Sequence, residues 1–208
     1  SLWSKPGHPA GAVDESKRGC RKGYRLLGGD AQAAPTLEGS RVREQLNEMQ
    51  GQPAPKLALK GWLNTKPMTL KKLKGKIVVL DFWATWCGPC RMEIPSLVRL
   101  RDSFDSKQVA VVGVSMDARP TPRETEALVK EFAENFEINY PLYLDSKHEL
   151  AMRLDKLAHF LPAIPATLIF DQTGVLRSSH RGVPRDRRGR LDPYSALGEE
   201  IQELLDGV

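Results

Sequence analysis

From residue 76 onward, short apolar runs alternate with segments whose apolar residues lie three or four positions apart. The apolar runs are rich in β-branched residues and predict buried strands at 76–84 and 109–117, with a shorter strand at 140–145. The helical spacing predicts helices at 89–104, 122–136, 146–157 and 193–208. Two further strand-like segments, 166–171 and 175–182, flank a short turn and predict a hairpin. This order of elements predicts an α/β fold with a mixed sheet covered by helices on both faces.

The first quarter of the chain has a different character. Residues 1–35 are rich in small, polar and charged residues without periodicity, which is typical of a flexible arm. Residues 36–51 have apolar positions on one helical face and predict a short helix, which Gly51 and Pro53 would end. We therefore divide the chain into a flexible basic extension, residues 1–50, and a compact domain, residues 51–208.

Composition and charge exclude some classes of protein. Hydrophobic residues make up 40% of the 208 residues, which is typical of a globular chain. The net charge of +5 is concentrated in the first 76 residues and in a segment with six arginines between Arg177 and Arg190. No nucleic-acid-binding motif accompanies these charges, so we expect solvated surfaces and no nucleic-acid partner. There is no apolar run long enough for a membrane helix and no signal-peptide core, so any targeting segment is expected to lie outside this sequence.

The candidate chemistry lies in Cys87 and Cys90, within the sequence "WCGPC". The pair could be a structural bridge, half of a metal site or a working redox pair. Three cysteines cannot build a disulfide framework, and the third, Cys20, lies in the basic extension. One C-x-x-C without a second pair does not complete a zinc site, and the histidines have no zinc-like spacing, so we expect no metal.

The position of the pair favours redox chemistry. A predicted strand ends just before Cys87 and a helix begins there, so Cys87 is expected at the helix N-terminus. Unpaired N–H groups and the helix dipole favour a thiolate at that place, which lowers the pKa of the thiol and activates it. We expect Cys87 to be the exposed thiol and Cys90, one turn into the helix, to be the more buried partner.

The segment "KGKIVVLDFWATWCGPCRMEIPSL" resembles the active-site region of thioredoxins, and more closely that of the TlpA/ResA-like thiol–disulfide oxidoreductases. The resemblance covers about residues 51–208. It implies a thioredoxin fold with an N-terminal β-hairpin before the core and a helix-and-strand insertion over residues 123–144. By position, Cys87 corresponds to the nucleophile and Cys90 to the resolving thiol, so the resemblance implies a redox disulfide between them.

The resemblance also assigns roles to other residues. Asp81 corresponds to the buried acid of thioredoxins, and burial would raise its pKa so that it could exchange a proton with Cys90. Glu93 corresponds to the acidic residue that TlpA/ResA-like proteins carry three positions after the second cysteine. Trp86 would shield the disulfide and offer an apolar surface to a substrate. For both acids the alternative is an ordinary structural or solvated side chain.

Pro165, in "AIPATLIF", corresponds to the cis-proline of the family. A cis bond there would turn the backbone of Ile164 towards Cys87, where it could pair with an extended substrate chain. One departure from the family pattern is the long arginine-rich segment before the last helix, which could contact an acidic partner.

We therefore expect a thiol–disulfide oxidoreductase, most simply a monomeric reductase of partner-protein disulfides, in an extracytoplasmic compartment as the resemblance implies. No nicotinamide or flavin fingerprint is present, so no cofactor is expected and electrons would come from an upstream protein donor. Two alternatives stay open: a peroxiredoxin-like thiol peroxidase, with Thr85 two positions before Cys87, and a module that binds copper or a partner on the same fold.

Overall fold

The computed structural model describes residues 61–65, 73–158 and 163–207. In this part of the chain the strands form one six-stranded sheet in the order β1-β4-β3-β2-β5-β6. The strands are β1 (Trp62–Leu63), β2 (Ile77–Trp83), β3 (Val109–Ser115), β4 (Leu142–Leu144), β5 (Ala166–Phe170) and β6 (Leu176–Arg181). The helices are α3 (Gly88–Ser103), α4 (Pro122–Asn135), α5 (Glu149–Ala158) and α6 (Pro193–Asp206).

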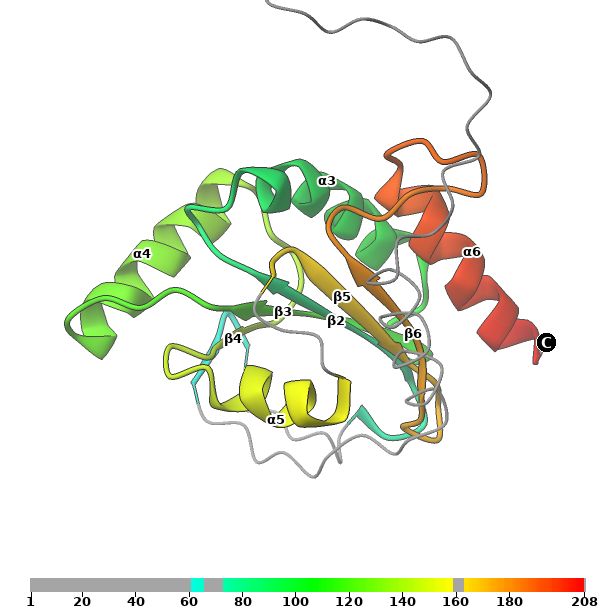
Figure 1. Cartoon of the computed structure of the whole chain (residues 1–208), viewed down its shortest axis with the longest axis horizontal. Coiled ribbons are helices and arrows are strands. Elements are labelled where there is room, and N and C mark those ends of the chain that lie inside the picture. Colours follow the sequence, from blue (N-terminus) through cyan, green and yellow to red (C-terminus); the bar gives the residue numbers. More distant parts are fainter. Residues whose placement is uncertain (1–60, 66–72, 159–162, 208) are drawn as a thin grey trace, which may run out of the picture. The chain divides into compact units, whose positions relative to one another are not determined.

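The sheet is mixed. Strand β2 pairs in parallel with β3, and β3 pairs in parallel with β4, while β5 runs antiparallel to β2 and β6 antiparallel to β5. Helices α3, α4 and α6 cover one face of the sheet and α5 covers the other (Figure 1). The predicted mixed sheet with helices on both faces is confirmed.

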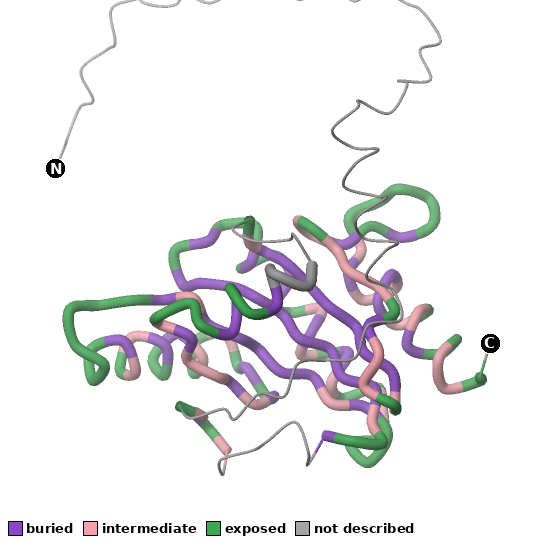
Figure 2. The backbone as a smooth tube through the Cα atoms, turned by 60° about the horizontal axis from the view of Figure 1, so that its bottom comes forward, coloured by how far each residue is buried: buried purple, intermediate pink, exposed green. Residues whose placement is uncertain are grey.

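Strand β2 lies at the centre and is buried along its whole length. Its side chains alternate between two apolar clusters: Ile77, Val79 and Trp83 contact the α3 side, and Val78, Leu80 and Phe82 contact the α5 side. Because both faces are buried, the strand has no polar alternation in its sequence. Figure 2 shows the buried residues following the strands through the middle of the domain.

Asp81 is the one acidic residue in β2, and the alternation places its side chain on the α3 side of the sheet. It pairs with Gly113 on β3 and with Thr167 on β5. The strand ends at Trp83, and the chain turns into α3 within a few residues. The fold therefore places the cysteines just beyond the carboxyl end of β2, and a buried acid within β2 two residues before that end.

The expected insertion is confirmed, because α4 follows β3 in the chain and β4 then extends the sheet beyond β3. Of the expected N-terminal hairpin, β1 is described, and it pairs antiparallel with β4. The rest of that hairpin, the basic extension with its short helix, and Cys20 lie outside the described residues.

Candidate active site

Cys87 is the N-cap residue of α3, as its position at the strand–helix junction predicted. Its Sγ accepts a hydrogen bond from the backbone N–H of Cys90 at 3.2 Å, and Pro89 lies in the first helical turn. The two cysteines form a disulfide. After reduction, the same N–H group and the helix N-terminus would stabilise a thiolate on Cys87.

The sulfurs are well covered. Cys90 is the more buried partner at 1% exposed, but Cys87 is only 4% exposed, so the prediction of an exposed thiol is wrong for this disulfide form. Cys87 and Cys90 both belong to the apolar cluster beneath α3, which explains their cover. The exposed apolar side chains near the pair are Trp86 and Met92, at 68% and 61% exposed.

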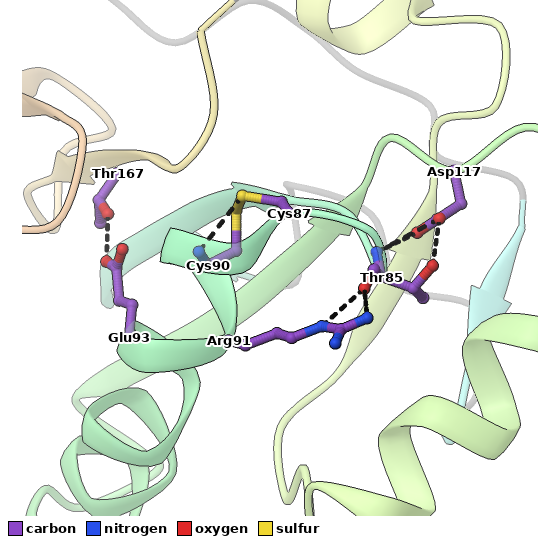
Figure 3. The surroundings of a disulfide bond; sticks show 7 residues. All are labelled: Thr85, Cys87, Cys90, Arg91, Glu93, Asp117 and Thr167. Carbon is purple, nitrogen blue, oxygen red and sulfur yellow. Dashed lines mark hydrogen bonds between the residues drawn. A yellow bond between two sulfur atoms is a disulfide. The ribbon is translucent and has the colours of Figure 1, made fainter. Parts of the chain in front are cut away.

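Two buried acids, Asp81 and Glu93, lie on the strand and the helix that flank the disulfide. Asp81 and Glu93 are each 1% exposed, and Thr167 Oγ1 donates a hydrogen bond of 2.9 Å to Glu93 Oε1 (Figure 3). The remaining oxygens Asp81 Oδ1 and Glu93 Oε2 have no hydrogen-bond partner among the described residues. Such groups are costly to ionise.

The pKa values of both acids follow from this burial. Loss of solvation raises the pKa of Glu93 from 4.5 to about 7, although the bond from Thr167 and the charge of His180 act in the opposite direction. Burial raises the pKa of Asp81 well above its ordinary value, and the neighbouring Glu93 raises it further. At least one carboxyl is therefore protonated near neutral pH, and the pair can take up or release a proton there.

Gly113, the residue of β3 that pairs with Asp81, is closely surrounded by large side chains. A Cβ atom at Gly113 would lie 2.9 Å from Trp83 Nε1, 3.1 Å from Tyr140 Cε2 and 2.6 Å from Leu142 Cδ2. The Tyr140 hydroxyl is buried without a partner among the described residues, and burial followed by the charges of Asp81 and Glu93 raises its pKa. The phenol therefore remains a neutral part of this interior.

A second polar network holds the loop before Cys87, and sequence reasoning missed it. Asp117, which is 1% exposed, accepts hydrogen bonds from the backbone N–H of Thr85, from the Thr85 hydroxyl at 2.7 Å and from Ser115 Oγ at 2.9 Å. Arg91 on α3 donates through Nε and Nη2 to the carbonyl of Thr85 (Figure 3). The signal in the sequence was an acid two residues after the end of β3, at the end of the sheet where β2 also ends.

The Ile164–Pro165 peptide bond is cis, as predicted. Pro165 is buried, and Ile164 is partly buried and packs against the cluster that contains both cysteines. The structure therefore brings Cys87, Cys90, Asp81, Glu93 and Ile164 to one region, although Ile164 lies far away in the sequence.

Much of the charge on the arginine-rich segment is matched within the domain. Arg187 forms ion pairs with Glu199 and Glu203 on α6, and Arg190 pairs with the buried Asp186. These contacts reduce the charge that the segment could offer to an acidic partner. Within the described ranges, no group of three or more potential ligands could hold a metal ion.

A central mixed sheet with a C-x-x-C disulfide at a helix N-terminus and a cis-proline nearby defines a thioredoxin-like thiol–disulfide protein. The AhpC/TSA family matches residues 50–179, and the chain belongs to it. The chain is 33% identical to thioredoxin-like protein YneN of Bacillus subtilis (strain 168) over 140 residues, which are 67% of this chain and 76% of that protein.

Other relatives agree with this assignment. The thiol-disulfide oxidoreductase ResA of Bacillus cereus is 30% identical over 145 residues, or 70% of this chain and 68% of ResA. Among solved structures, a thiol:disulfide interchange protein of the thioredoxin family from Chlorobium tepidum TLS superposes with a TM-score of 0.61 at 25% sequence identity. The superposition includes 75% of this chain and 97% of the chain from Chlorobium tepidum TLS. The resemblance to thioredoxin-like thiol–disulfide oxidoreductases and the fold class are confirmed.

Proposed function

We propose that this protein reduces disulfides of partner proteins through the Cys87–Cys90 dithiol. The observation that carries the proposal is the placement of this pair at the N-terminus of α3, whose next turn carries the buried Glu93, with the buried Asp81 on the preceding strand β2; the pKa values of both acids are raised. An activated nucleophile and a proton acceptor that works near neutral pH are the two requirements of the reaction.

The reaction begins on the reduced protein. The Cys87 thiolate attacks one sulfur of the partner's disulfide, a new S–S bond forms, and the partner's other sulfur leaves as a thiolate. Cys90 then gives its proton to the ionised member of the Asp81–Glu93 pair and attacks Cys87 Sγ. The second partner thiolate leaves, the partner has gained two electrons, and the Cys87–Cys90 disulfide has re-formed. A dithiol protein upstream would return two electrons and regenerate the reduced pair.

Substrate docking is part of the proposal. Trp86 and Met92 expose large apolar side chains beside the pair, and Ile164 packs against the same cluster. An extended segment of the partner could lie over this surface and pair with the Ile164 backbone. We expect one monomer to be sufficient for the reaction.

We also propose an extracytoplasmic location, which the resemblance to TlpA/ResA-like proteins supports. No helix in the described ranges is long and apolar enough to cross a membrane. Immunodetection of the native protein in separated cell fractions would test the location, and recovery only with cytoplasmic markers would contradict it.

Trapping of the mixed disulfide tests the activity. In the full chain with Cys20→Ser, the reduced Cys90→Ser variant should form a stable covalent adduct with a peptide that contains one disulfide. Mass spectrometry should place the adduct on Cys87. The matched Cys87→Ser variant should form no such adduct. Equal adduct formation by both variants, or none by either, would contradict the assigned roles.

The peroxidase alternative has less support, although the family description includes AhpC. The Thr85 hydroxyl donates to Asp117, and Cys87 bonds to a cysteine only three residues away. Hydrogen peroxide consumption should therefore be slow compared with reduction of the peptide disulfide, and the reverse order would favour a peroxidase.

A further inference from the structure

A row of residues crosses the sheet from the acid pair to its outer strand. Asp81 on β2 pairs with Thr167 on β5, and Thr167 pairs with His180 on β6. Side chains at directly paired positions point to the same face of a sheet. The row therefore runs along the α3 side, from the buried centre at Asp81 to the strand at the sheet edge.

Two helices packed over this row of residues, α3 and α6, each contribute a carboxylate to it. Glu93 on α3 accepts a hydrogen bond from Thr167, and Glu200 on α6 has its Oε1 3.1 Å from His180 Nε2. Ser178, two residues before His180 on the same face of β6, donates to Glu200. The side chains of His180 and Glu200 are 21% and 32% exposed, whereas Asp81, Glu93 and Thr167 are almost fully buried. The row thus joins a buried acid pair to a partly solvated histidine–carboxylate pair.

We propose that His180, oriented by Glu200, is a positioning residue that controls the ionisation of Glu93 and thereby couples proton transfer at the cysteines to the pH outside. His180 touches neither sulfur. It acts through its charge, because an imidazolium at the end of the row stabilises a carboxylate in the dry interior more strongly than it would in water. The proposal deepens the proposed function, and its effect on turnover rests on that function.

The electrostatics of the site support the direction of this effect. The charge of His180 lowers the pKa of Glu93, against the larger rise caused by burial. A proton bound by the imidazole therefore favours the Glu93 carboxylate, and a neutral ring favours the protonated acid. Among the described residues, the other ionisable groups that face this region are Asp81 from β2, Tyr140 from the segment before β4, and Glu200 from α6, with Arg187 acting on Glu200.

The charge on His180 affects how much of Glu93 is available as a proton acceptor in the proposed reaction. Cys90 can pass its proton only to an ionised carboxyl. At pH values below the Glu93 midpoint most of the Glu93 carboxyl would be protonated and unable to accept a proton. The charged form of His180 keeps a larger fraction of Glu93 ionised there. The pair His180–Glu200 therefore extends the working range towards lower pH.

Carboxyl titration by NMR tests the inference without any enzyme assay. The full chain, reduced and labelled with carbon-13 in Glu side chains, is titrated from pH 5 to 9, and the Glu93 signal is assigned with Glu93→Gln. Replacement His180→Gln should raise the Glu93 midpoint by about half to one pH unit, because the cation is lost. Replacement His180→Lys keeps a cation and should hold the midpoint at or below the wild-type value. The matched control His148→Gln changes a histidine outside the row and should leave the midpoint unchanged.

Two results would overturn the inference. One is a wild-type midpoint in His180→Gln, and the other is an equal rise in His180→Gln and His180→Lys, which would indicate a structural disturbance. If His180→Gln does not fold, His180→Asn makes the same test with a smaller neutral side chain. The trapping experiment on Cys90→Ser decides the proposed function separately, so the two failures are distinguishable. If both proposals hold, the acidic limb of the pH profile for peptide-disulfide reduction should move with the NMR midpoint.

Discussion

Ionisation of Glu93 should make the protein less stable as the pH rises, and Glu93→Gln should remove much of this dependence. The pKa of the carboxyl is about 7 in the folded protein, compared with 4.5 as its ordinary value. Between these values the folded state binds more protons than the unfolded state, so the contribution is fully present below 4.5 and is lost as the pH rises through about 7. At about 1.4 kcal/mol per pH unit, this interval corresponds to about 3 kcal/mol of the free energy of unfolding.

The measurement is urea unfolding of the oxidised protein at pH 4.5, 6, 7 and 8, since the Cys87–Cys90 disulfide then has no thiol proton to titrate. Wild type should lose about 3 kcal/mol more than Glu93→Gln between the lowest and highest pH. Some dependence should remain in the variant, because burial raises the pKa of Asp81 in the same direction. Glu131→Gln, which removes an exposed carboxyl from α4, is the matched control and should follow wild type.

Parallel curves for wild type and Glu93→Gln would refute the reasoning. They would mean that Glu93 titrates near its ordinary value in the folded protein, despite its burial. The role of Glu93 as a proton acceptor near neutral pH would then be lost as well.

Two further predictions concern Asp81 and Gly113, its partner on β3. Asp81→Asn should keep the fold but slow reduction of a peptide disulfide at least about tenfold, mainly at the release of the mixed disulfide; stopped-flow turnover that is unchanged between pH 6 and 8 would show that Asp81 is only structural. Gly113→Ala should lower the free energy of unfolding in urea by about 1–3 kcal/mol, because the new methyl group would press on Leu142 and Trp83. The control Gly198→Ala meets only Leu100 Cδ1 at 3.7 Å and should be neutral or stabilising, so equal losses for both alanines would contradict this account.

The elements of the fold could be predicted because each depends on local periodicity. Strand β2 was evident as a continuous apolar run, and α4 was evident from its helical spacing. The position of Cys87 at a helix N-terminus was also a local property, since the strand, the cysteine and the proline lie within a few residues.

The surroundings of the cysteines could not be predicted in the same way. Glu93 and Thr167 are 74 residues apart in sequence, and Thr85 and Asp117 are 32 apart. Their contacts depend on the register between strands, which hydrophobic patterning alone leaves open. The family resemblance indicated Asp81 and Glu93, but it gave no indication of Gly113, Asp117 or His180. The burial of Cys87 was mispredicted because a position at a helix N-terminus suggests exposure, whereas both cysteines belong to the apolar cluster beneath α3.

The register of the central strands has a consequence for protein engineering. Gly113, Asp81, Thr167 and His180 belong to four neighbouring strands, and they meet only because the strands pair as they do. A graft of residues 86–90 onto another strand–helix junction would transfer the nucleophile and its helix end, but it would not transfer the proton acceptor. Transplantation of the full chemistry would require the paired strands as one unit, with a residue as small as glycine beside the acid.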